Sequence, residues 1–70
     1  MTASDFTAAI REIGWSLRHV AEMLHCDDKL PNRWHQGRAS VPPEIARWLE
    51  RLAAAHARHP APIDWRRRGN

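Results

Sequence analysis

The sequence predicts an all-α fold, a compact bundle of four or five helices, from three observations. Helix-forming residues, chiefly alanine, leucine, arginine and glutamate, dominate the chain, and β-branched residues are few. Apolar residues recur at helical spacing in several segments. Glycine or proline separates those segments, at the places where helices commonly begin and end.

The length of seventy residues is that of one small domain. We expect residues 1–59 to form it, and residues 60–70 to make an extended or disordered basic tail that docks on a partner subunit. The single cysteine, Cys26, cannot form an internal disulfide. The N-terminal residues do not have the pattern of a signal peptide and no apolar stretch is long enough to span a membrane, so we expect a cytoplasmic protein without a leader.

The first helix is expected to begin at Ser4 as N-cap, with Asp5 near its positive end, and to stop at Gly14. Ser16 can cap a second, shorter helix that ends near His25. The apolar faces of the two helices are formed by Phe6, Ala9, Ile10 and Ile13, and by Leu17, Val20, Ala21 and Leu24.

The third helix explains a proline close to two acids. With Asp28 as N-cap, Pro31 is the third helical residue, whose amide has no partner inside the helix. Leu30 and Trp34, four apart, are expected to point into the core, and Gly37 ends the helix. The outward face then carries Lys29, Asn32, Arg33 and Gln36.

The fourth helix follows a connector in which Val41 is the expected apolar anchor. Pro42 or Pro43 occupies its first position, with Glu44 in the first turn. The prolines after His59 favour an extended path. The inner stripe of the helix is predicted to be Ile45, Trp48, Leu49, Leu52 and Ala53, with His56 extending it.

Two short helices joined by a three-residue turn are the helix-turn-helix pattern. Ala21 would let the two helices approach closely, Cys26 would hold the turn, and Trp34 would be buried late in the second helix. The major groove of DNA admits one α-helix, and the second helix of such a pair enters it N-terminus first. The pattern therefore predicts double-stranded DNA as the partner.

The charges are distributed unevenly along the chain. Residues 1–30 hold three cations and five acids, whereas residues 31–70 hold eight cations and three acids, for a net charge of +3. Ten of the eleven cations are arginine, whose planar fork suits phosphates and guanine edges. A basic half favours a polyanionic partner, with a solvated basic surface as the equally weighted alternative.

The run from Gly14 to about Leu52 resembles the phage repressor/Cro-type helix-turn-helix regulators, which include phage autorepressors and regulators associated with anti-CRISPR operons. The resemblance implies a homodimeric repressor or autorepressor that binds an inverted-repeat operator through a helix near residues 28–36. The matching positions are Gly14, Trp15, Ser16, Ala21, Leu24, Arg33, Trp34, Gly37, Val41 and Pro42.

The chain departs from the family pattern at the positions nearest to DNA. Leu17 replaces the family's early glutamine, His25 its turn glycine, and Pro31 the valine of its recognition helix. Asp27 and Asp28 stand close to where phosphates or bases would lie, and carboxylates repel the DNA backbone. These departures bear on base reading more than on the fold.

The helix following Asp28 supplies the expected DNA contacts. Lys29, Asn32 and Arg33 are the base-reading candidates, because asparagine suits adenine and arginine suits guanine; the alternative is a solvated helix face. The candidates for contacts to DNA phosphates are Ser16, Arg18, Gln36, Arg38 and Ser40. For Ser16 a purely capping role is as well supported.

Self-contact is expected to involve the fourth helix and the tail, because one short recognition helix gives a weak grip. The predicted dimerisation residues are Trp48, Arg51, Ile63 and Trp65. The basic run Arg66–Arg68 either reaches DNA phosphates or acidic protein, or forms part of a disordered tail.

No enzyme, cofactor, small-molecule ligand or metal site is expected. His56 and His59 lie three apart and His25 adjoins Cys26, but zinc needs three or four convergent ligands. The chief rival to DNA binding is a protein-interaction module such as an antitoxin or adaptor. A second rival is an architectural DNA-binding protein without sequence choice.

Overall fold

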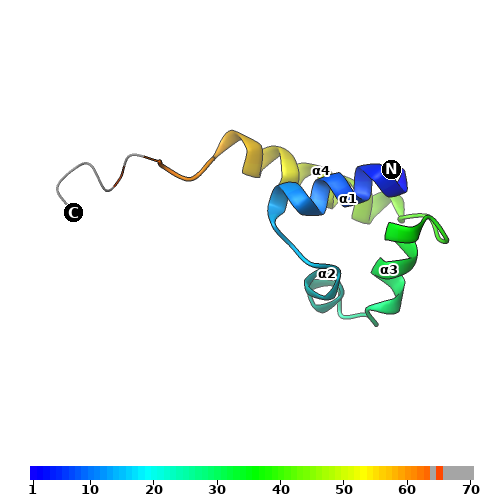
Figure 1. The fold of residues 1–70 in the computed structure, drawn as a ribbon. Coiled ribbons are helices and arrows are strands. Elements are labelled where there is room, and N and C mark those ends of the chain that lie inside the picture. The colour runs from blue at the N-terminus through cyan, green and yellow to red at the C-terminus, as the bar shows by residue number, and fades with distance from the viewer. Residues whose placement is uncertain (64, 66–70) are drawn as a thin grey trace.

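A computed structural model of the protein describes residues 1–63 and 65. Within that part the chain is all-helical and without strands (Figure 1). Its helices are α1 (Ala3–Ile13), α2 (Leu17–Leu24), α3 (Lys29–Gln36) and α4 (Pro43–Arg58). The predicted all-α class is confirmed, with α4 as the longest helix.

The first helix begins earlier than predicted. Thr2, and not Ser4, is the N-cap, because its hydroxyl accepts a hydrogen bond from the Asp5 amide at 3.0 Å. The Asp5 carboxylate accepts one from the Thr2 amide at 3.1 Å, which completes a capping box. These bonds hold the pKa of Asp5 below its usual value. The helix ends at Gly14, which takes the left-handed conformation as expected.

The turn between α2 and α3 places a histidine in an unfavourable conformation. Ser16 caps α2 as predicted, and the helix ends at His25, whose φ is 55°. A non-glycine residue in this region costs of the order of 1–2 kcal/mol. Two amides just after the helix keep the turn closed: that of His25 donates to the Glu22 carbonyl at 3.3 Å, and that of Cys26 to the Ala21 carbonyl at 3.0 Å.

The two acids before α3 have different roles at the start of the helix. Asp28 is the residue before the helix, but its side chain makes no capping hydrogen bond. Instead Asp27 Oδ1 accepts from the Lys29 amide at 2.9 Å. Asp28 is thus the N-cap by position, and Pro31 the third helical residue, as predicted, whereas the side-chain hydrogen bond to the helix amide comes from Asp27.

The core is built around Trp34, which is 1% exposed and meets the ring of Phe6 edge-on at 5.7 Å between centroids. Pro31 is buried beside it in α3, whereas Leu30 is 37% exposed. The expectation that Leu30 points into the core is wrong; Pro31, one position on, takes that place. The cluster consists of Phe6, Ala9, Ile10, Val20, Trp34, Val41, Ala46 and Leu49.

The helices pack in a chain of contacts in which α1 touches α4 and α3, and α3 touches α2. Figure 1 shows α4 running alongside α1 and continuing past its end. Two cross-links fix this arrangement: the rings of Trp15 and Trp48 lie 5.6 Å apart, and His56 Nδ1 lies 3.0 Å from Glu12 Oε2. α3 is thus held against α1, and α2 is held against α3. No described helix is long and apolar enough to cross a membrane.

Candidate nucleic-acid interface

A hollow of about 240 Å³ opens over α3 and the residues that follow it. All three predicted base-reading residues line it, together with two of the predicted phosphate-binding residues. The lining carries three cations and two amide side chains, and no carboxylate. Its members are Lys29, Asn32, Arg33, Gln36 and Arg38.

The three base-reading candidates differ in how free their polar groups are. Lys29 and Arg33 are exposed, so their donors face solvent. Asn32 is half-buried, and its Nδ2 donates to the Asp28 carbonyl at 2.9 Å. Pairing with adenine uses both the amide donor and the amide acceptor of an asparagine. Asn32 must therefore give up or share its bond to Asp28 before it can read adenine.

The acid at the start of α3 is turned towards the helix backbone. The amide of Lys29 donates to Asp27, and this bond, with the nearby charges of Lys29 and Arg33, holds the pKa of the Asp27 carboxyl below its usual value. The carboxylate charge lies at the positive end of the α3 dipole. Asp27 does not line the hollow, so the hollow itself is free of negative side chains.

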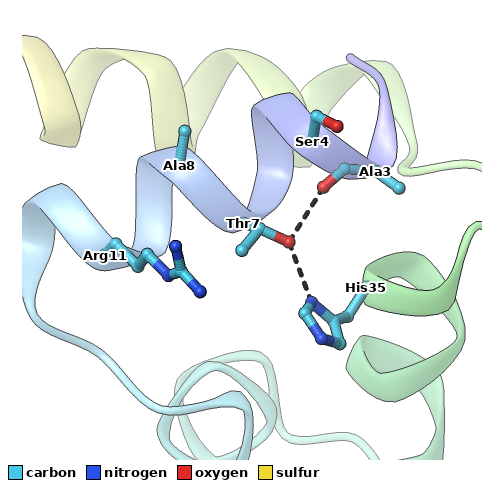
Figure 2. Close-up of a pocket in the computed structure, with 6 residues that line it drawn as sticks. All are labelled: Ala3, Ser4, Thr7, Ala8, Arg11 and His35. Atoms are coloured by element: carbon cyan, nitrogen blue, oxygen red, sulfur yellow. Dashed lines mark hydrogen bonds between the residues drawn. The ribbon is translucent and has the colours of Figure 1, made fainter.

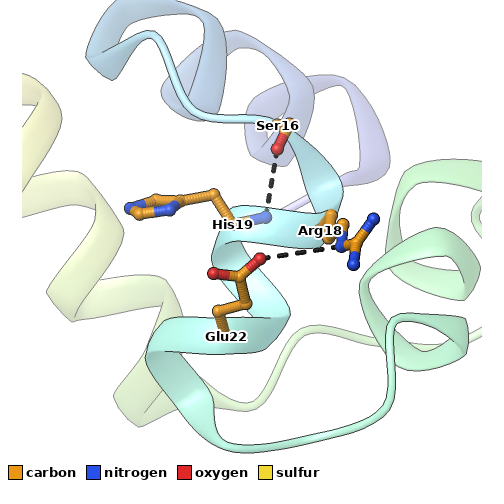
Figure 3. Close-up of polar contacts among 4 residues, drawn as sticks. All are labelled: Ser16, Arg18, His19 and Glu22. Carbon is orange, nitrogen blue, oxygen red and sulfur yellow. Dashed lines mark hydrogen bonds and ion pairs between the residues drawn. The ribbon is translucent and has the colours of Figure 1, made fainter.

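The remaining phosphate candidates lie outside the hollow. Ser16 is exposed, and its Oγ accepts from the His19 amide at 3.0 Å, which is the capping role (Figure 3). Arg18 Nε lies 3.7 Å from Glu22 Oε1 in an exposed pair along α2. Such a pair is weak and exchanges readily for another anion. Ser40 is exposed in the connection before α4.

The predicted dimerisation residues lie along α4 and beyond it. Trp48 is half-buried against Trp15, and Arg51 is exposed. Ile63 is 93% exposed and Trp65 49% exposed. Arg66–Arg68 lie outside the described residues.

A second hollow, of about 300 Å³, lies between α1 and α3 and was not foreseen from the sequence. Its lining is Ala3, Ser4, Thr7, Ala8, Arg11 and His35 (Figure 2). Thr7 and Arg11 are four apart on α1, which is a detectable signal, but their nearness to His35 depends on how α1 and α3 pack. That packing is not readable from either helix alone.

Among the described residues no group of three or more histidine, cysteine or acidic side chains is placed to hold a metal ion. The chain matches no protein-family model, no curated protein and no solved structure.

Proposed function

We propose that the chain is a sequence-specific double-stranded DNA-binding transcriptional regulator, in which α2 and α3 form a helix-turn-helix and α3 enters the major groove. The observation that carries the proposal is the hollow over α3, lined by three cations and two amides without a carboxylate. Cations attract the phosphate backbone, and forked or amide side chains distinguish base edges.

In this proposal the side chains on the outer face of α3 have different roles. Arg33 and Lys29 donate to the O6 and N7 atoms of guanine, and Asn32 reads adenine after its amide leaves the Asp28 carbonyl. Gln36 and Arg38, further along the same hollow, hold phosphates and fix the register. Arg18 and Ser16 at the start of α2, with Ser40 before α4, add phosphate contacts beside the hollow.

The regulator acts as a homodimer on an inverted repeat, because two α3 helices one helical turn of DNA apart bind far more tightly than one. Trp48 and Arg51 of α4 make the self-contact, together with Ile63 and Trp65 beyond the end of that helix. The bound dimer represses transcription by blocking promoters, including the promoter of its own gene. That last step follows the family resemblance of residues 14–52.

The proposal is tested by measuring duplex affinity against salt for the wild type and Arg33→Gln. Phosphate-driven binding has a log–log slope of about −0.9 per phosphate contact. Arg33→Gln should lower affinity for the preferred duplex by about 1–3 kcal/mol and much less for a scrambled one. Arg47→Gln, the same change at an exposed residue of α4, is the matched control.

Two outcomes would contradict the proposal. Absent or salt-independent binding to every duplex would instead indicate a protein-interaction module, such as an antitoxin or adaptor. An equal loss on all sequences for Arg33→Gln would indicate an architectural protein that does not read bases.

A further inference from the structure

The second hollow, between α1 and α3, has the chemistry of an anion site. Arg11 is the one charged side chain of its lining apart from His35, which charges on protonation. Figure 2 shows the guanidinium of Arg11 and the ring of His35 reaching into the same space from the two helices. No carboxylate lines the hollow.

The hydrogen bonds of Thr7 fix which nitrogen of His35 carries a proton. Thr7 Oγ1 donates to the Ala3 carbonyl at 2.9 Å and lies 2.8 Å from His35 Nδ1. A hydroxyl has one proton to give, so with that proton on Ala3 the oxygen must accept from Nδ1–H. The other ring nitrogen, Nε2, faces away from Thr7 (Figure 2) and becomes a donor when the ring is protonated.

The N-terminal end of α1 borders the hollow. Ser4 lines the hollow from the first turn of α1, where amides have no partner inside the helix and the dipole is positive, but its side chain points away from Arg11 and His35 (Figure 2). Asp5, the acid of that turn, is bonded to Thr2 in the capping box and is not part of the lining. The acid of the first turn is thus engaged in the capping box.

We propose that this hollow binds a phosphate group, held by the guanidinium of Arg11 and the Nε2–H of a protonated His35. The arginine fork matches two phosphate oxygens at once. Two sources supply this chemistry, a backbone phosphate of duplex DNA or free phosphate. The DNA source rests on the proposed function: His35 lies three positions after Asn32 on α3, so a strand bordering the groove occupied by α3 passes beside it.

The first arm of the test uses inorganic phosphate and the full chain with ¹⁵N-labelled histidine, at constant ionic strength. Phosphate should shift the His35 ring signals saturably, and Arg11→Gln should weaken that response about tenfold. Arg47→Gln should leave it unchanged, and the His59 signals, from the end of α4, should not follow the same curve. Thermal unfolding of each variant verifies that it is folded.

The second arm measures duplex affinity for the wild type, Arg11→Gln and His35→Gln. If the ligand is a DNA phosphate, each variant should bind the duplex about tenfold more weakly than the wild type does. When the phosphate that contacts the hollow is replaced by neutral methylphosphonate, each variant should bind that duplex as well as the wild type does. A His35 response to phosphate without any effect on duplex affinity supports the site with free phosphate as its ligand. Failure in both arms overturns the site, whereas absence of any duplex binding by the wild type counts against the proposed function alone.

Discussion

The two sides of α3 differ sharply although they belong to the same two turns of helix. The inner side holds Pro31 and Trp34, both buried, whereas the outer side holds Lys29 and Arg33, both exposed. The inner side contributes stability through burial of apolar surface. The exposed side chains of the outer side do not contribute to stability in this way, so they can be substituted without loss of the core. Stability and the proposed recognition are therefore separable by single substitutions within one helix.

The largest effect is expected from Trp34→Ala, which removes the central side chain of the inner side. Loss of a buried tryptophan costs about 3–5 kcal/mol. That is most of the stability of a small domain, which is at the low end of about 5–15 kcal/mol. Chemical denaturation followed by circular dichroism should show a largely unfolded chain, and duplex binding should be lost with the fold. A variant that stays folded with wild-type stability would contradict the assigned core.

Arg33→Gln is the complementary change on the outer side. Its effect on the free energy of unfolding should stay within about 0.5 kcal/mol, as is usual for exposed residues. Urea denaturation beside the binding measurement described above separates the two quantities. A stability loss comparable to that of Trp34→Ala would mean that the two sides of α3 are not independent.

The turn that sets the direction of α3 offers a smaller change of opposite sign. His25→Gly should stabilise the protein by about 1 kcal/mol, because glycine adopts a φ of 55° without steric cost. Gly14→Ala is the matched opposite: φ there is 84° and no atom lies within 4 Å of an added Cβ, so strain alone should destabilise by a similar amount. Thermal midpoints measure both, and a destabilising His25→Gly would contradict this reading of the turn.

The smallest effect concerns the two helix-capping acids. The pKa values of Asp5 and Asp27 are below their usual 3.8 in the folded protein. Their contribution to stability is therefore complete above about pH 4 and is lost as the pH falls through the lowered values. Asp27→Asn should flatten the fall in thermal midpoint between neutral and acid pH. Glu50→Gln, at an exposed position on α4, should leave the profile as it is in the wild type.

Periodicity and helix-ending residues predicted much of this fold from the sequence. Gly14, Ser16 and Gly37 were placed correctly because each acts within one helical turn. The N-cap of α1 was predicted wrongly because two nearby residues can both cap a helix. Thr2 caps in place of Ser4, because Asp5 lies three residues after Thr2, the spacing of a capping box.

Side-chain direction was the harder property to predict. Leu30 is more apolar than Pro31, yet the proline is the residue that faces the core. A spacing of four from Trp34 selected Leu30, whereas a spacing of three selects Pro31, and helix geometry allows both. Ala46, buried on α4, was likewise missed because alanine gives a weak apolar signal.

The two candidate sites also differ in whether local sequence spacing could predict them. The hollow over α3 could be predicted because four of its five lining residues lie on one helix face. The Arg11–His35 hollow could not, because its two walls come from helices far apart in the sequence. Prediction from local spacing succeeds on one helix and fails where two helices meet.

The measurement closest to the central claim is a selection of bound duplexes from a random library by the wild-type protein at near-physiological salt. The proposed regulator should enrich an inverted repeat whose half-sites are centred about 10 base pairs apart, with guanine at a fixed position in each half-site. Repetition with Arg33→Gln should lose that guanine while the wild type retains it. Recovery of duplexes without any shared sequence, or of none at all, would contradict the claim that the outer side of α3 reads DNA.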